Sequence, residues 1–296
     1  RYVVHRATRP DFPLLKEWLP NPPGQAGQVD GVQVWKQGLA EGGYATAWTL
    51  DTDSDWHTLW VSIAYAWPGV LETIGAEAAA VVRDAQAEPK TAFSQAHRDW
   101  WRSYYAESFF SVSDRYWESF YWNQLYKLAS ATRAGSPLLD LQGPWDQETP
   151  WPGTWWNLNV QLTYWPMYTG NRLALAQPLA RSLKEHLPQL IANVEPEFQH
   201  DSAGIYRSST TRLAGGVFYP SKVGVPGRGE AEIGNLLWAC HNLWLHYRMS
   251  LDEELLRETL FPVLRRAVNA SLRLGQSTNA AGIGRVAVRA DLPEVL

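Results

Sequence analysis

Cysteine is almost absent from this chain, which contains one such residue, Cys240, among 296. A lone cysteine cannot form a disulfide within the chain, and it cannot build a zinc site from thiolate ligands. Cys240 lies within an apolar helical pattern, so we expect it to be a packed core residue. No other cluster of ligand side chains indicates a metal site, and no motif implies a cofactor.

The chain also lacks a long apolar run and an excess of charge of one sign. No stretch approaches the ~20 apolar residues that a membrane-spanning helix requires, so we expect no membrane partner. The formal net charge is −4, which gives no indication of a polyanionic partner such as nucleic acid. Nucleophile elbows and zinc-protease helices are missing, and Gly282 and Gly284 form only a fragment of a nucleotide-binding loop.

An initial methionine is missing as well. The chain begins at Arg1, within what already reads as structure, and ends shortly after Leu292-Pro293-Glu294, so we expect an internal fragment of a longer protein. A signal peptide would then lie upstream. The sequence therefore specifies neither a compartment nor an oligomeric state.

Tryptophan, by contrast, is abundant, with 17 residues. Five of them lie in residues 138–170, where glycine and proline interrupt regular structure and asparagine, glutamine and aspartate stand between the indoles. Indole faces stack on the C–H face of a pyranose ring while amides and carboxylates bind its hydroxyl groups, so this segment predicts a sugar-binding loop. For any single indole, core packing is the more common role. The tryptophans concerned are Trp145, Trp151, Trp155, Trp156 and Trp165.

Strands are predicted in the first part of the chain. Residues 32–35, 44–48 and 59–65 are rich in β-branched and aromatic residues and are separated by glycine, aspartate and proline. We interpret residues 1–68 as the C-terminal part of an N-terminal β-sandwich domain, that is, as its closing strands. The aspartates of residues 51–55 lack the glycine and the distal glutamate of a calcium loop, which favours a solvated turn.

Helices are predicted in the rest of the chain. Residues 70–87 have the spacing of an amphipathic helix, and we expect residues 69–91 to be a linker helix. Residues 92–296 read as helices in paired succession, with a long glycine-rich loop at 195–229. The pattern is mainly α and predicts the N-terminal part of an (α/α)6 toroid catalytic domain; a helical solenoid is the alternative, without a repeat of fixed length to support it. The expected helices are residues 93–109, 113–133, 158–166, 172–193, 232–249 and 250–275.

Capping residues indicate where several of these helices begin. Ser113 and Asn171 are predicted N-caps, because their side-chain oxygens can accept a hydrogen bond from the first turn. Ser250 and Glu253 have the spacing of a capping box. Pro166 is expected to kink or end its helix.

Four short motifs in the tryptophan-rich segment resemble the signature of glycoside hydrolase family 95. They are LQGPW at residues 141–145, PW at 150–151, WNLNVQ at 156–161 and YWP at 164–166. A second, less specific resemblance covers residues 238–247 and the helix through Pro262 and Ala267. The family contains inverting α-L-fucosidases and α-L-galactosidases. The resemblance implies an N-terminal β-sandwich, a linker helix, an (α/α)6 catalytic toroid and a C-terminal β domain.

The resemblance also implies catalytic roles. In the family, two asparagines hold and polarise the attacking water, and they match Asn157 and Asn159, whose spacing of two lets both side chains face one cleft from an extended segment. An amide is a feeble base and needs a carboxylate behind it, and inversion requires the acid and base groups to be ~6.5–9.5 Å apart. The family's aspartate lies further downstream, and its acid glutamate follows a loop like residues 290–294. We therefore expect this chain to carry only the water-holding half of the site.

Several other residues are candidates for sugar contacts. Trp155 stands where the resemblance predicts a histidine against the sugar, so the hydrolase class is better indicated than fucose. Glu232 could instead be a charge in the first turn of a helix. Glu118 is a further carboxylate, for which an exposed helical position is the simpler expectation. His241 and His246 are expected to be core residues rather than metal ligands. The predicted substrate-binding set is Trp145, Trp155, Trp156, Glu232 and Trp238.

Two classes of function fit these residues. The first is an inverting, exo-acting glycosidase that removes terminal α-linked sugars from an oligosaccharide or polysaccharide. The second is a non-catalytic carbohydrate-binding protein with an aromatic cleft. Another toroid enzyme, such as a lyase or a phosphorylase, is a third interpretation, which the reaction products would distinguish.

Overall fold

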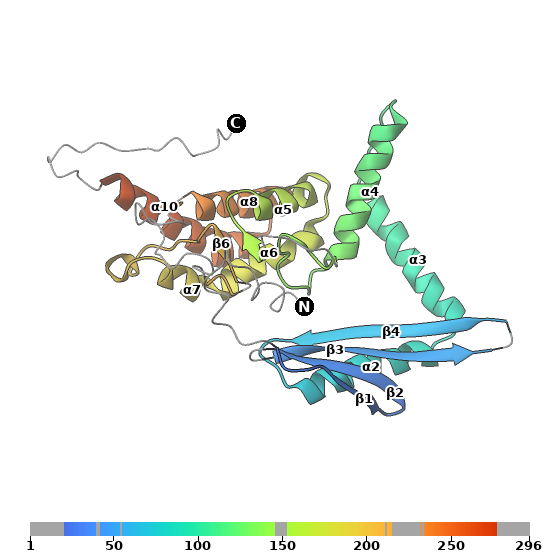
Figure 1. Cartoon of the computed structure of the whole chain (residues 1–296). Coiled ribbons are helices and arrows are strands. Elements are labelled where there is room, and N and C mark those ends of the chain that lie inside the picture. Colours follow the sequence, from blue (N-terminus) through green and yellow to red (C-terminus); the bar gives the residue numbers. More distant parts are fainter. Residues whose placement is uncertain are drawn as a thin grey trace. The chain divides into compact units, whose positions relative to one another are not determined.

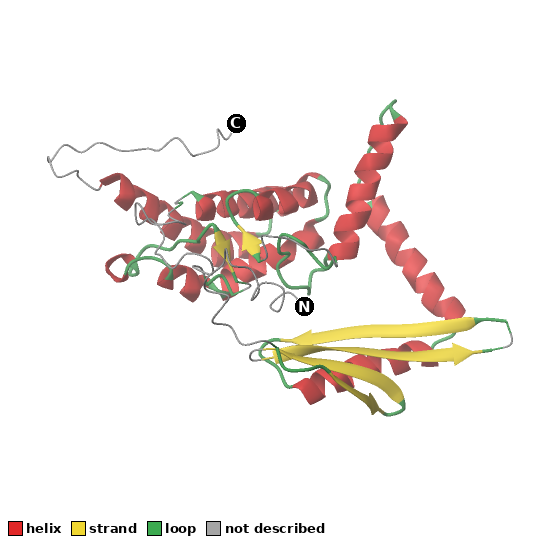
Figure 2. Ribbon diagram, in the orientation of Figure 1, coloured by secondary structure: helices red, strands yellow, loops and turns green. Residues whose placement is uncertain are grey.

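The computed structural model describes residues 21–39, 42–53, 55–145, 153–210, 212–214, 232 and 234–276. The chain divides into two compact units, Arg1–Ala106 and Glu107–Leu296, and each is described by itself. It is mainly helical, with a small antiparallel sheet in the first unit (Figures 1 and 2). The predicted domain limits at residues 68 and 91 stay predictions.

A four-stranded antiparallel sheet, in the order β1-β2-β3-β4, forms the base of the first unit. Strands β1 (Gln25–Val29) and β2 (Val32–Leu39) form a hairpin through Asp30 and Gly31, whose φ angles of 49° and 83° suit a type I′ turn. Strand β3 (Gly42–Thr52) pairs with β2 and with β4 (His57–Ala66). The three predicted strands are confirmed, and β1 precedes them.

Helix α2 (Leu71–Ala87) covers one face of this sheet (Figure 1). Alternate residues of β2 and β3 point toward the helix, because successive side chains of a strand face opposite sides. The helix predicted over residues 70–87 is therefore confirmed, and it supplies half of the core rather than a simple connection. The buried residues of this core are Val32, Val34, Ala45, Ala47, Ile74, Ala78, Ala79 and Val82.

The opposite face of the sheet is apolar but exposed. On β4, Leu59, Val61, Ile63 and Tyr65 alternate with the residues that face α2, and each is more than half exposed. A β-sandwich would cover such a face with a second sheet. The described part of this unit contains one sheet, so the sandwich stays a prediction.

Helix α3 (Lys90–Ala106) follows α2 and is tied to β4 at its first turn. Lys90 Nζ donates a hydrogen bond to Thr58 Oγ1 at 2.9 Å. The ring of Phe93 meets Trp60 edge to face, with 5.7 Å between the centroids. The helix predicted over residues 93–109 is thus confirmed with its limits moved three residues toward the N-terminus.

The second unit is helical, and its core lies where α5 (Asn159–Thr169) contacts α6 (Leu173–Glu185) and α8 (Asn235–Ser250). Helix α10 (Phe261–Gln276) packs on α8, while α4 (Arg115–Ala131) precedes the tryptophan-rich segment. Figure 2 shows the short two-stranded sheet beside these helices. The buried core residues include Val160, Tyr164, Met167, Tyr168, Leu179, Leu183, Leu236, Ala239, Cys240, Leu243 and Val263. The expectation that Cys240 is a packed core residue is confirmed.

The predicted start of α4 is off by one residue. Asp114, not Ser113, is the N-cap, and its carboxylate accepts a hydrogen bond from Tyr116 N at 2.9 Å. Both residues are good caps, so the sequence alone does not choose between them.

The predicted capping box at Ser250 is wrong. Ser250 is the last residue of α8, which ends where Leu251 adopts a left-handed φ of 56°. Asp252 therefore caps the next helix, α9 (Glu253–Leu255), by accepting from Glu254 N and Leu255 N at 2.9 and 3.0 Å. A short π-helical turn, η3 (Leu256–Leu260), then leads into α10.

The single helix predicted over residues 172–193 is also wrong. It divides at His186 into α6 and α7 (Leu187–Ala192), because Pro188 lacks the N–H that would continue the first helix and is suited to the start of a new one. Asn171 is not the N-cap of α6; its Nδ2 donates to Glu107 O at 2.8 Å instead. Helix α5 continues past Pro166 to Thr169.

Candidate functional site

A two-stranded sheet places the asparagine pair. Strand β5 (Thr154–Trp155) pairs with β6 (Ser208–Ser209), and Trp156 N continues the ladder by donating to Arg207 O at 2.7 Å. The hydroxyl groups of Thr154 and Ser209 are 2.6 Å apart and share a hydrogen bond. Two segments that are far apart in the sequence are thereby joined immediately before Asn157.

Trp156 is the anchor of this arrangement rather than part of its surface. Its side chain has no exposed area, and its indole Nε1 donates to Ser209 Oγ at 2.8 Å. A fully buried indole cannot stack on a sugar, so the predicted substrate-binding role of Trp156 does not fit this placement. The neighbouring Trp155 is half-buried and stays a candidate for a sugar contact.

Asn157 and Asn159 lie at the mouth of α5. Asn157 is exposed in the turn after β5, and Asn159 is the half-buried first residue of the helix. Within the described part of the chain, neither side-chain amide has a hydrogen-bond partner. The N-cap residue, Leu158, supplies no capping side chain, so backbone N–H groups of the first turn also face outward there. Two amides and a helix N-terminus are thus available to water or a ligand.

Glu232 is joined to the same region by an ion pair with Arg207. The Glu232 Oε1 atom is 2.6 Å from Arg207 Nη2 and 2.7 Å from Arg207 Nε. Its Oε2 atom accepts from Asn235 Nδ2 at 3.2 Å. Helix α8 begins only at Asn235, so Glu232 precedes the helix and is not a first-turn charge. The carbonyl of Arg207 accepts a hydrogen bond from Trp156 N. Arg207 therefore connects Glu232 with Trp156, the residue that precedes the asparagine turn.

The loop that carries Trp145 is fixed at its base. Asp140 Oδ1 accepts hydrogen bonds from the backbone N–H groups of Gln142 and Gly143 at 3.0 and 2.6 Å. Leu141 N donates to Gly153 O at 3.1 Å, just before β5. Trp145 itself is half exposed, as a ring that contacts a ligand would be.

Further aromatic side chains lie on α5 and α8. Trp165 is partly exposed and meets His241 edge to face at 5.9 Å between centroids, and burial lowers the pKa of His241. Trp238, one turn before His241, is half-buried and remains a candidate for a sugar contact. His246 is buried against Tyr168, as expected of a core histidine.

Glu118 belongs to the first turn of α4. It is half-buried, and its carboxylate accepts from Ser111 Oγ at 3.3 Å and Val112 N at 3.4 Å. These contacts hold the segment that leads into the helix. We therefore leave Glu118 outside the candidate site.

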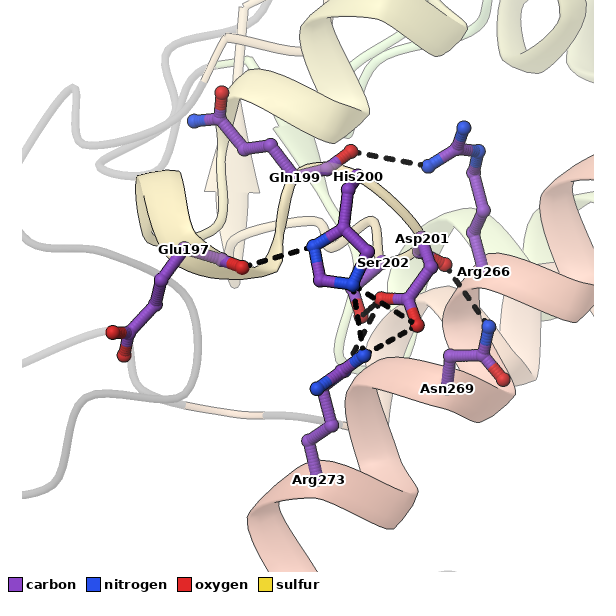
Figure 3. Close-up of polar contacts among 8 residues, drawn as sticks. All are labelled: Glu197, Gln199, His200, Asp201, Ser202, Arg266, Asn269 and Arg273. Carbon is purple, nitrogen blue, oxygen red and sulfur yellow. Dashed lines mark hydrogen bonds and ion pairs between the residues drawn. The ribbon is translucent and has the colours of Figure 1, made fainter.

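A second polar cluster, the Asp201 clamp, is shown in Figure 3. Arg273 of α10 donates from Nε and Nη2 to the two oxygens of the Asp201 carboxylate, at 3.1 and 2.5 Å. Ser202 Oγ donates to the same carboxylate at 2.8 Å, and His200 Nε2 lies 3.1 Å from Arg273 Nη2. The hydrogen bond from Arg273 is the main reason that the pKa of Asp201 falls to about 2.

The clamp fastens the segment around η2 (Pro196–Phe198) to α10. Asn269 Nδ2 donates to Asp201 O at 3.1 Å, and Arg266 Nη1 donates to Gln199 O at 3.2 Å (Figure 3). Since its charges are already matched by one another, we interpret this cluster as structural.

Sequence reasoning missed Arg207, and it placed Gln161 among the polar residues of the sugar-binding segment without predicting that its amide is buried. Gln161 has no exposed area and occupies the same face of α5 as Tyr164 and Tyr168. A polar residue at three- and seven-residue spacing from buried aromatics is a signal that could have found it. Arg207 carried no such signal, because its role depends on Glu232, which is distant in the sequence.

Some predicted positions cannot be placed. Trp151, residue 211 and residues 215–229 of the glycine-rich loop, the fragmentary glycine motif at Gly282 and the loop of residues 290–294 lie outside the described residues. In the described part, no group of three or more histidine, cysteine, aspartate or glutamate side chains is arranged to hold a metal ion. The helices described there include none with the length and apolar character needed to cross a bilayer.

A large part of the chain matches a known protein family. Residues 91–283 match the glycosyl hydrolase family 95 catalytic domain. The chain is also similar to alpha-L-fucosidase 2 of Arabidopsis thaliana, with 29% identity over 147 residues that cover 47% of this chain and 16% of that relative. The family match takes in the asparagine pair, the two-stranded sheet and α8, and it extends over more than half of the sequence, so this chain belongs to glycosyl hydrolase family 95.

Proposed function

We propose that this chain forms part of a glycosidase that removes terminal α-linked sugars with inversion at the anomeric carbon. The observation that carries the proposal is the position of Asn157 and Asn159, two accessible amides at the mouth of α5. Membership of family 95 supports the hydrolase class. The name of the similar plant protein, alpha-L-fucosidase 2, supports an α-L-fucoside. An α-L-galactoside is the alternative that the family resemblance implies.

In the proposed mechanism, the amide oxygens of Asn157 and Asn159 accept hydrogen bonds from the attacking water and direct its lone pair toward the anomeric carbon. An amide is too weak a base to remove the proton alone, so a carboxylate behind the pair completes the general base. A separate carboxylic acid protonates the leaving oxygen from the opposite side of the sugar ring. No cofactor takes part.

Glu232 has a different role in this proposal. Both of its oxygens already accept hydrogen bonds, from Arg207 and Asn235, which suits an ionised carboxylate rather than a proton donor. We assign Glu232 to sugar binding at the edge of the site. Trp145, Trp155 and Trp238 are the aromatic surfaces proposed to contact an oligosaccharide or polysaccharide.

The proposed architecture follows the family. Residues 92–296, with helices α3 to α10, would belong to an (α/α)6 toroid, and the exposed face of the sheet would belong to a β-sandwich. The pairing of α5 with α6 and of α8 with α10 is consistent with the toroid.

The test measures release of free sugar from α-L-fucosyl and α-L-galactosyl substrates by the full-length protein and by an Asn157→Ala, Asn159→Ala double variant. We expect the double variant to lose about 10²–10⁴-fold in kcat, the usual contribution of general-base assistance. Proton NMR of the first product anomer should show inversion. Equal turnover by the two proteins would contradict the mechanism.

A carbohydrate-binding protein without catalysis is the second candidate, because half-exposed Trp145 and the two free amides would serve binding alone. Titration of the unaltered protein with the same sugars decides between the candidates. Saturable binding without product release would favour this second function.

A further inference from the structure

The backbone of Trp156 is held by a closed ring of hydrogen bonds. Gln161 Nε2 donates to the carbonyl of Trp156 and, at 3.2 Å, to the carbonyl of Asn235. Asn235 Nδ2 donates to Glu232, Glu232 accepts from Arg207, and the carbonyl of Arg207 accepts from Trp156 N. The backbone N–H and the carbonyl of Trp156, the residue that precedes Asn157, are therefore both held by this ring.

Gln161 is the member of the ring whose role most clearly requires its own side-chain group, a primary amide. Its side chain is fully buried, and the two groups in front of its Nε2 atom are both carbonyl oxygens, so only an NH2 group with two hydrogens satisfies them. Its Oε1 atom is buried without a hydrogen-bond partner among the described residues. An amide with an unsatisfied oxygen is costly in a core, which indicates that its two donors are needed there.

The backbone of Gln161 is fixed as well. Asn242, a buried residue of α8, donates from Nδ2 to Gln161 O at 2.9 Å. Helix α8 thus holds the first turns of α5 through two contacts, one at the carbonyl of Asn235 and one from Asn242. Residues 157–160 lie between two anchored residues, Trp156 and Gln161. The course of the backbone through this segment is therefore fixed at both of its ends.

We propose that Gln161 is a positioning residue that sets the direction of the Asn157 amide. The inference rests on the proposed function and deepens it. The Gln161 side chain does not touch substrate; it holds the carbonyl of Trp156 so that the next peptide aims Asn157 toward the water. Misplacing a reacting group by an ångström is enough to lower the rate while the sugar still binds.

The test compares Gln161→Met with the unaltered full-length protein. Methionine matches the length of glutamine but donates no hydrogen bond. We expect kcat to fall about 10–100-fold with KM changed less than about threefold, since the Gln161 side chain itself makes no contact with the sugar. Gln189→Met is the matched control, because Gln189 of α7 donates one hydrogen bond, to the C-cap residue Asn193, and lies outside the ring. It should leave both constants unchanged.

A second measurement separates positioning from general loss of structure. If Gln161 acts through Asn157, then Gln161→Met should change kcat less than about threefold when introduced into an Asn157→Ala background. Additive losses in the double variant, or an unchanged kcat in the single variant, would overturn the inference while leaving the proposed function intact.

Hydrogen exchange of the Trp156 and Leu162 amides, which donate to Arg207 O and Leu158 O, gives a readout that does not depend on turnover. We expect faster exchange of these two amides in Gln161→Met and unchanged exchange in Gln189→Met. Should the unaltered protein release no sugar, the proposed function fails, and exchange alone decides whether Gln161 fixes the turn. Unchanged exchange in the variant would refute that role.

Discussion

Trp156 and the asparagine that follows it are neighbours in the chain with opposite surroundings. The indole is fully buried and bonded to Ser209, while the Asn157 amide is exposed. The change from buried to exposed within one residue follows from strand geometry, because successive side chains of β5 and its extension face opposite sides. One face of this short segment therefore anchors it, and the other is free for chemistry.

The buried role of Trp156 leads to a prediction about stability. Trp156→Phe removes the hydrogen bond to Ser209 Oγ and leaves a small cavity, so we expect the free energy of unfolding to fall by about 1–3 kcal/mol. Urea denaturation followed by circular dichroism measures the change. Trp145→Phe is the control, since its ring is half exposed, and it should stay within about 0.5 kcal/mol. Equal effects of the two substitutions would contradict this placement.

At the scale of residues, the sequence located the important segment but not the role of each side chain in it. The resemblance identified Asn157 and Asn159 as candidates. Trp155 and Trp156 were both assigned to the sugar, because their composition alone does not show which faces the core. That distinction arises only when β5 pairs with β6, a contact between distant segments.

At the scale of elements, backbone strain is clearest at the end of a helix, α8. Leu251 terminates α8 with a left-handed φ of 56°, a conformation that glycine adopts more readily than leucine. Its side chain is 70% exposed, so little packing would be lost on replacement. The chain uses an unfavourable residue at this turn.

Leu251→Gly should therefore stabilise the protein. We expect a gain of about 0.5–1 kcal/mol, the relief of left-handed strain less the added flexibility of glycine in the unfolded chain. Leu272→Gly, at an exposed position inside α10, should instead lose about 1 kcal/mol. Thermal unfolding of both variants measures the difference, and a loss at Leu251 would show that the turn is not strained.

The Asp201 clamp gives an element-scale prediction that depends on pH. The pKa of Asp201 is lowered to about 2, so its ionised form stabilises the folded state above the ordinary pKa of the group. This contribution is lost as the pH falls from about 4 toward about 2. The melting temperature of Asp201→Asn should thus lie below that of the unaltered protein at neutral pH, with the gap closing in acid.

The control for this prediction is Asp99→Asn. Asp99 pairs with Arg102 one turn away on α3, at 3.1 Å, and both side chains are mostly exposed. Such a surface pair contributes little. A pH-independent gap for Asp201→Asn, or an equal gap for Asp99→Asn, would show that the clamp does not stabilise the attachment of the η2 segment to α10.

Hydrophobic periodicity predicted most of the helices. The residues at which these helices begin and end were predicted less accurately. The apolar spacing of α2 and α8 was sufficient to find both. The division of residues 172–193 was missed although Pro188 marked it, and the start after Ser250 was missed because the left-handed turn at Leu251 cannot be read from a leucine.

The whole molecule consists of two units, which differ in how far apart in the sequence their contacting residues lie. The first is joined by neighbouring strands, which local patterns predict well. In the second, Gln161 contacts Asn235 and Arg207 contacts Glu232 across long stretches of chain. No local pattern selects such partners, so the ring around Trp156 could not have been predicted from the sequence. Family membership supplied the class of enzyme, but not the residues that hold its amides in place.

Strand β4 has a practical consequence for recombinant work. Among the described strands it is the last of the sheet and pairs with β3 alone, and it contains no lysine, arginine, aspartate or glutamate. Free edges of this kind recruit further chains, and natural proteins blunt them with charge. A truncated product limited to residues 21–106 would self-associate along β4, so a lysine at Val61 or Ile63 is the substitution by which such a fragment could be kept from aggregating.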